Sequence, residues 1–141
     1  MGTKNTDDLG LELMSQPNLD KYLKSNQASF FDWDVSELLT QLYQKKNISK
    51  ASLARCANIS EVYLHQVFSG RRIPSRDRLL CICIGLQASS EETQALLKQA
   101  GYAQLYLKRR RDAIIYYGLI HHLTLAEIND QLTSHKEKAL I

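Results

Sequence analysis

Residues 61–69 carry several side chains that can contact nucleic-acid bases, at spacings that share one face of a helix. A glutamine amide can pair with N6 and N7 of adenine, a carboxylate can accept a hydrogen bond from N4 of cytosine, and a valine methyl can touch the methyl group of thymine. The segment therefore predicts contacts with base edges in a DNA groove. The candidate base-contact residues are Glu61, Val62, His65 and Gln66.

Cationic and hydroxyl side chains surround the same segment, and both types are typical of contacts with phosphate groups. Residues 35–86 carry eight basic and three acidic side chains, whereas residues 1–34 carry three and six, and residues 87–141 carry seven and six. Positive charge gathered on one segment is the electrostatic pattern that DNA binding requires. The candidate DNA-backbone contacts are Ser49, Lys50, Ser60, Tyr63, Ser69, Arg71, Arg72 and Arg76.

Two short helices joined by a tight turn must position these side chains. Asn58 stands where the first helix should end, because Asn is the common substitute for Gly in the left-handed conformation that ends a helix. Ile59 is expected to fill the space between the helices, and Ser60 to cap the second one. The predicted buried residues of the pair are the small Ala54 and, one helical turn apart, Leu64 and Val67.

The motifs ISKASLA (48–54), NIS (58–60), YL (63–64) and GRRIP (70–74) follow one another in a fixed register. On these motifs, residues 35–86 resemble the Cro and phage-repressor (XRE) family of bacterial regulators. Lys50, Asn58 and Phe68 depart from the pattern, since the family often has Gln, Gly and Glu there. Phe68 is expected to fill an extra core pocket or to face a partner.

The resemblance implies an all-α fold with a lambda-repressor-like five-helix DNA-binding domain. It also implies a sequence-specific, double-stranded-DNA-binding transcriptional regulator, expected to be a repressor. In such proteins the second helix of the motif, here residues 61–69, enters the major groove, while the first crosses the phosphate backbone. Family members commonly bind paired half-sites as dimers, so a homodimer is expected.

The wider pattern predicts three parts: an acidic N-terminal arm with one short helix (1–33), the DNA-binding domain (34–101) and a C-terminal helical extension (102–141). The five helices of the domain are expected at residues 34–46, 49–58, 61–69, 76–86 and 91–100. Asp34 and Glu37 form a capping-box pattern for the first of these. The aromatic residues Phe30, Phe31 and Trp33 are expected to fold onto the domain or to cover a partner.

The extension is expected to contain two more helices. Gln104 to His122 begins with the basic run 108–111 and becomes apolar on every side from Ile114 to Ile120, so it must pack in the core or meet another subunit. We take this apolar half as the candidate dimerisation element. The run 108–111 would extend the phosphate contacts or bind an acidic partner. Thr124 and Glu127 predict the start of the last helix, and the tail from Ser134 is expected to fray.

Catalytic and metal chemistry are not expected. His121, His122 and His135 have no partner at a metal-ligand spacing, and the sequence shows neither a glycine-rich phosphate loop nor a recognisable nucleophile. Cys56, Cys81 and Cys83 are interpreted as core packing. The sequence therefore predicts no enzyme, no cofactor and no metal site.

A membrane location is not expected either. No apolar run approaches the roughly 18 residues that span a bilayer, and the first residues lack a basic stretch followed by an apolar core. The expected location is cytoplasmic.

The alternative function is that of an adaptor, in which a helix-turn-helix fold binds a partner protein instead of DNA. The acidic arm and the aromatic residues near Trp33 leave room for such a partner. The basic residues of segment 35–86 argue for DNA.

Overall fold

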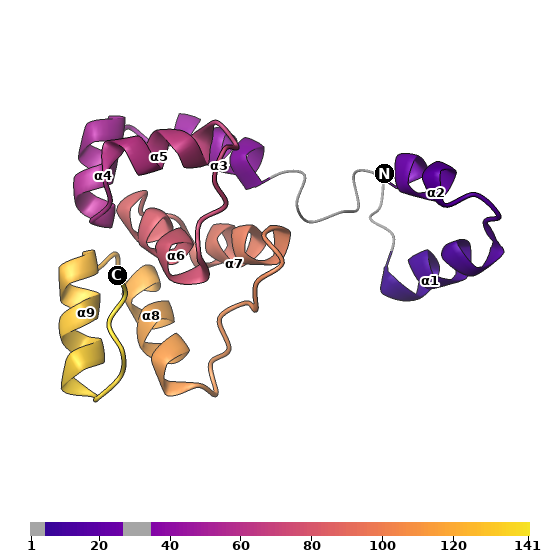
Figure 1. The fold of residues 1–141 in the computed structure, drawn as a ribbon. Coiled ribbons are helices and arrows are strands. Elements are labelled where there is room, and N and C mark those ends of the chain that lie inside the picture. Colours follow the sequence, from indigo (N-terminus) through magenta and orange to yellow (C-terminus); the bar gives the residue numbers. More distant parts are fainter. Residues whose placement is uncertain (1–4, 27–34) are drawn as a thin grey trace. The chain divides into compact units, whose positions relative to one another are not determined.

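The computed structural model describes residues 5–26 and 35–141 (Figure 1). Every regular element among these residues is an α-helix, which confirms the predicted all-α class. The chain divides into two compact units, residues 1–33 and residues 34–141. The aromatic residues at 30, 31 and 33, and the predicted cap at Asp34, lie outside the described residues. The longest described helix has 11 residues, and none of those helices is a candidate membrane span.

The N-terminal unit contains two helices, α1 (Thr6–Ser15) and α2 (Leu19–Ser25), although only the second was expected. The side chain of Asn5 caps α1 by accepting a hydrogen bond from the Asp8 amide at 2.8 Å. Two aspartates in the first turn also suit the positive end of the helix dipole. None of the residues of α1 is buried, so its N-terminal cap is the clearest sequence signal for this helix.

Residues 34–141 form a second unit around one continuous apolar core. Its helices are α3 (Val35–Gln44), α4 (Lys50–Ala57), α5 (Glu61–Phe68), α6 (Arg76–Gly85), α7 (Ser90–Gln99), α8 (Arg110–Ile120) and α9 (Leu125–Ser134). All five helices expected in segment 34–101 are present, and each begins and ends within two residues of its expected bounds. Ser89 caps α7, and Glu92 completes its capping box.

Helix α6 lies at the centre of this unit, between the α3–α5 group and the α8–α9 pair (Figure 1). All residues from Leu79 to Leu86 are buried, so α6 needs packing partners on every side. Close approach by α4 is possible because Gly85 has no side chain. A Cβ atom there would lie 2.9 Å from Cδ1 of Leu53 and 3.3 Å from the backbone nitrogen of Ala57.

The expected helix at 104–122 begins only at Arg110, so its first part was wrongly predicted. Leu105 is buried and exchanges two hydrogen bonds with the side-chain amide of Gln94, at 2.7 and 3.0 Å. The Tyr106 amide donates to Oδ2 of Asp112 at 2.9 Å. These side chains satisfy backbone groups that a helix would otherwise pair, and the segment therefore stays irregular.

The C-terminal tail is packed against the unit, which corrects the expectation that it frays from Ser134. Leu140 is buried and exchanges two hydrogen bonds with the side-chain amide of Asn129, at 2.7 and 3.0 Å. Most residues of the tail are polar, so its sequence did not indicate that Leu140 anchors it.

The apolar run of α8 packs mainly inside the unit. Ile115, Gly118 and Leu119 are buried, whereas Tyr117 is 52% exposed and Ile120 is 49% exposed. Of the two alternatives for this segment, intramolecular packing accounts for the buried residues. The homodimer stays a prediction, with Tyr117 and Ile120 as the apolar side chains that α8 leaves uncovered.

The three cysteines do not share one environment. Cys81 and Cys83 are buried in α6, as expected, and burial raises their pKa to about 11 and about 12 respectively. Cys56 is exposed at the end of α4, so the interpretation of this thiol as core packing is wrong. It lies at the edge of the contact with α6, where a Cβ atom at Gly85 would be 3.4 Å from its own Cβ.

Gly118→Ala should destabilise the second unit, because a Cβ atom at this position would lie 2.4 Å from Cγ1 of Ile128 in α9. We expect the free energy of unfolding to fall by about 1–3 kcal/mol, as is usual for overpacked cores. Chemical denaturation followed by circular dichroism measures the change. Gly10→Ala is the control, since nothing lies within 4 Å of a Cβ atom there. A Gly118→Ala protein as stable as the control would show that α8 and α9 do not pack this closely.

Candidate nucleic-acid interface

The turn between α4 and α5 has the local geometry that the sequence predicts. Asn58 adopts the left-handed conformation, with φ 55° and ψ 45°. The Asn58 amide donates to the carbonyl of Arg55, and the Ile59 amide donates to the carbonyl of Ala54 at 3.0 Å. This pair of bonds is the Schellman arrangement that closes a helix end. Ser60 then caps α5 by accepting a hydrogen bond from the Tyr63 amide at 3.1 Å.

The predicted inner face of the pair is confirmed. Ala54, Leu64 and Val67 are buried, and Ile59 is half-buried against the core. Helices α3 and α4 therefore pack against the buried face of α5. Its opposite face is left to the solvent.

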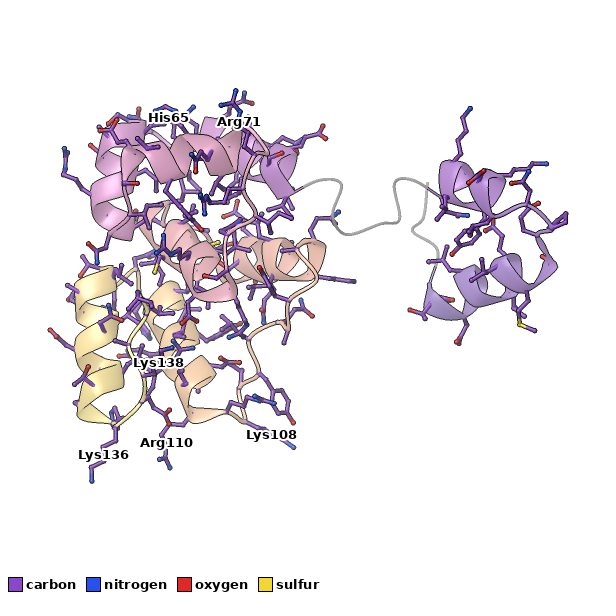
Figure 2. All side chains as sticks on the ribbon, viewed as in Figure 1. His65, Arg71, Lys108, Arg110, Lys136 and Lys138 are labelled. Carbon is purple, nitrogen blue, oxygen red and sulfur yellow. The ribbon has the colours of Figure 1, made fainter. Side chains whose placement is uncertain are left out.

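That outer face carries the predicted base-contact residues. Glu61, Val62 and His65 are exposed, with Val62 68% exposed, and Gln66 is half-buried. Figure 2 shows His65 and Arg71 projecting outward from the same end of the unit. All four candidates thus lie on one accessible surface, which we call the α5 face.

Two hollows flank this ridge, with volumes of about 730 and 510 Å³. Lys50, His65 and Arg71 line the first, and Tyr63, Arg72 and Arg78 line the second. Val62 and Gln66 line both. The two side chains therefore form the crest of a convex ridge with cationic groups on either side.

Gln66 is already oriented in the free protein. Its Oε1 accepts a hydrogen bond from Nε of Arg72 at 2.9 Å, and its backbone carbonyl accepts from the amides of Arg71 and Arg72. The bond fixes which end of the amide points away from the arginine. The side-chain NH2 group of Gln66 is left to donate to an outside acceptor.

Aromatic rings support the cationic groups at the rim. Nζ of Lys50 lies 5.1 Å from the ring centroid of Phe68 and 5.8 Å from that of Tyr43, and the two rings meet edge to face at 5.3 Å. Cations at these distances are attracted by the negative face of a ring. Phe68 therefore packs against the core and Tyr43 and holds Lys50. Its half-buried ring also lines the first hollow, so a contact with a partner stays a prediction.

A second ring, Tyr63, supports two arginines on the other side of α5. The guanidinium carbon of Arg72 lies 5.2 Å from its centroid, and that of Arg78 lies 4.6 Å away. From the sequence, Arg78 was only a remote candidate for phosphate contact, because a charged residue at a helix start is often simply solvated. The position of the Tyr63 ring beside both arginines follows only from the fold.

The predicted DNA-backbone contacts differ in the hydrogen bonds that their side chains already make. Ser49 and Ser60 cap α4 and α5 by accepting amide hydrogen bonds, and each keeps its hydroxyl proton for an outside acceptor. The hydroxyl of Ser69 donates to the carbonyl of Gln66 at 3.1 Å. Lys50, Tyr63, Arg71 and Arg72 lie around α5 as expected.

Arg76 does not belong to this interface, which corrects its prediction as a phosphate contact. Its guanidinium lies 3.1 Å from Oδ2 of the buried Asp112 and also donates to the carbonyls of Ala103 and Gln104. The charge is thus used inside the unit, joining α6 to the start of α8. Its partner is 36 residues away, so local sequence could not reveal the pair.

A metal centre does not form among the described residues, where no three His, Cys, Asp or Glu side chains cluster. Comparison with protein-family models, with curated proteins and with solved structures finds no match for this chain. The functional inference therefore depends on the geometry of the α5 face.

Substitution at Asn58 should reveal how far the turn depends on the left-handed backbone. Asn58→Ala is expected to lower the free energy of unfolding by about 1 kcal/mol, because a Cβ-bearing residue without a local polar group is strained there. Asn58→Gly should preserve or raise stability, since Gly adopts this conformation freely. Denaturant titrations measure both, with the exposed Asn47→Ala as control. Equal losses for Ala and Gly would contradict this account of the turn.

Proposed function

We propose that residues 35–141 form a sequence-specific DNA-binding transcriptional regulator of the lambda-repressor-like class. In this proposal α4 and α5 are the helix-turn-helix, and α5 enters the major groove. The observation that carries it is the α5 face, an exposed ridge of Glu61, Val62, His65 and Gln66 with cationic side chains along both sides. A convex helical ridge fits a major groove about 12 Å wide.

The parts of the site then divide by role. Glu61, Val62, His65 and Gln66 read base edges, because they form the exposed surface of α5. The rim fixes register on the duplex without reading sequence. It consists of Ser49, Lys50, Ser60, Tyr63, Ser69, Arg71, Arg72 and Arg78, the last of which lies over the Tyr63 ring.

The proposal includes a homodimer and repression. Two recognition helices would occupy half-sites one helical turn apart, or a multiple of it. The exposed Tyr117 and Ile120 of α8 are the contact that we propose for the second subunit. Repression would follow from occupancy of the DNA near a promoter.

A second candidate is the adaptor function, which one observation favours. The described part of the N-terminal unit exposes several large apolar side chains, among them Leu11, Met14 and Leu19, with Met14 86% exposed. Such side chains gathered on a small unit are typical of a protein-binding surface. A regulator binds mixed-sequence duplex DNA at low salt and releases it at high salt, whereas an adaptor should not.

Replacing Arg71 and Arg72 by Ala should weaken binding to all duplex sequences alike. Each lost phosphate contact is expected to flatten the plot of log affinity against log salt by about one unit. Fluorescence anisotropy with a labelled duplex at several salt concentrations measures both effects. Lys21→Ala/Lys24→Ala removes the same charge from exposed positions of α2 and should leave the slope unchanged. An unchanged slope in the arginine variant would remove these residues from the interface.

Gln66→Ala should relax the base preference at one position of the site. We expect discrimination there to fall by about 1–3 kcal/mol, because the contact of this side chain with a base edge is lost. A random-library binding selection measures the preference and reports whether the site contains paired half-sites. Gln131→Ala, at an exposed glutamine of α9, is the control. Recovery of the same preferred sequence with Gln66→Ala would exclude this side chain from base readout.

A further inference from the structure

A second group of basic side chains lies far from the α5 face on the same unit. Lys108, Arg110 and Lys136 lie along the end opposite to His65 and Arg71, and Lys138 lies above them in the same half of the unit (Figure 2). Arg109 stands between two of them in sequence, and all five side chains are exposed. We call the five residues 108, 109, 110, 136 and 138 the α8 basic surface.

Specific hydrogen bonds hold its two segments together. Nε of Arg111 donates to the carbonyl of Lys138 at 2.8 Å, which ties the tail to the first turn of α8. Asn129 fixes the tail from the other side through its two bonds with Leu140. The fold thus brings together charges that lie 26 or more residues apart in sequence, and it keeps them there.

The charges of the α8 basic surface have no ionic partner among the described residues. Two neighbouring carboxylates pair inside the unit, Asp112 with Arg76 at 3.1 Å and Asp77 with Arg111 at 3.0 Å. Glu137, between Lys136 and Lys138, is the acidic residue of the tail. Arg111 and Arg76 are therefore structural, whereas residues 108–110, 136 and 138 present free positive charge to solvent.

Part of this charge opposes the helix that carries it. Arg109 occupies the cap position of α8 without any side-chain hydrogen bond, and Arg110 follows in the first turn. Cations at this end of a helix face its positive dipole, which disfavours them. A bound anion would reverse the balance, since it is attracted by the arginines and by the free amide groups of the helix end together.

We propose that the α8 basic surface binds the phosphate backbone of a second DNA duplex, so that one protein molecule bridges two duplex segments. The inference rests on the proposed function of the α5 face, which holds the first duplex. Both surfaces cannot contact one short stretch of straight DNA, because they lie at opposite ends of the unit (Figure 2). DNA is stiff over about 150 base pairs, so a short duplex does not fold back to reach both.

Capture of one duplex by another tests the proposal. A biotinylated duplex of about 30 base pairs, short against the persistence length, is fixed to beads with the full-length protein. A labelled duplex is then added at low salt. We expect the protein to retain the labelled duplex, and Lys108→Gln/Arg109→Gln/Arg110→Gln to reduce retention at least about tenfold while its affinity for a single duplex changes less than about twofold.

Two further variants keep the result interpretable. Lys136→Gln/Lys138→Gln removes charge from the other segment of the surface and should also reduce retention. Lys21→Gln/Lys24→Gln/Lys98→Gln removes three exposed charges elsewhere and should retain the labelled duplex as the natural sequence does. The thermal midpoint of the 108–110 variant should stay the same or rise, because it relieves the unfavourable charge at the start of α8.

Other outcomes would overturn the proposal. Retention by the 108–110 variant would show that bridging comes from paired α5 faces of a dimer. Equal losses of retention and of single-duplex affinity would show that the surface contacts the first duplex. Absence of retention, with binding of labelled poly-glutamate that the 108–110 variant loses, would assign the surface to an acidic protein. If no single duplex binds at all, the proposed function of the α5 face fails instead.

Discussion

The second unit depends on the burial of α6 from Leu79 onward. A helical segment that is apolar on every side is stable only when other helices cover all of it. Helices α4 and α7 pack against one part of the α6 surface, and α9 packs against another. Gly85 lets α4 approach closely enough to seal one side. Because α4 is fixed against α6, the turn at Asn58 sets the direction of α5. The outer face of α5 therefore lies against the solvent. The position of the candidate interface is thus a consequence of how the core is filled.

Local signals in the sequence were sufficient for the pair α4 and α5. Asn58, Ser60, Leu64 and Val67 act through neighbours within a few residues, so their types and spacing already indicate the cap, the turn and the buried face. The misinterpreted residues depend on distant partners. Arg76 is engaged by Asp112, the 104–109 segment is held by Gln94, and the tail is held by Asn129. No pattern within a single helix contains that information.

Lys50 and Phe68, two residues that depart from the pattern of the regulators that the sequence resembles, contact each other in the fold. Phe68 and Tyr43 form an aromatic pair beside the Lys50 ammonium group. Tyr63 supports Arg72 and Arg78 in the same manner. Rings placed under long cationic side chains restrict their motion, and an ordered charge loses less conformational entropy when it meets a phosphate.

Cys56 is a site for selective chemical labelling of the protein. It is the one exposed thiol of the three, it lines a hollow of about 580 Å³ between α4 and the turn that precedes α9, and it is two residues from Asn58. Burial protects the other two thiols sterically, and their raised pKa values keep them protonated at neutral pH. A maleimide dye or spin label would therefore attach at one position of the natural sequence, beside the turn that orients α5, and would report on that turn without any engineered cysteine.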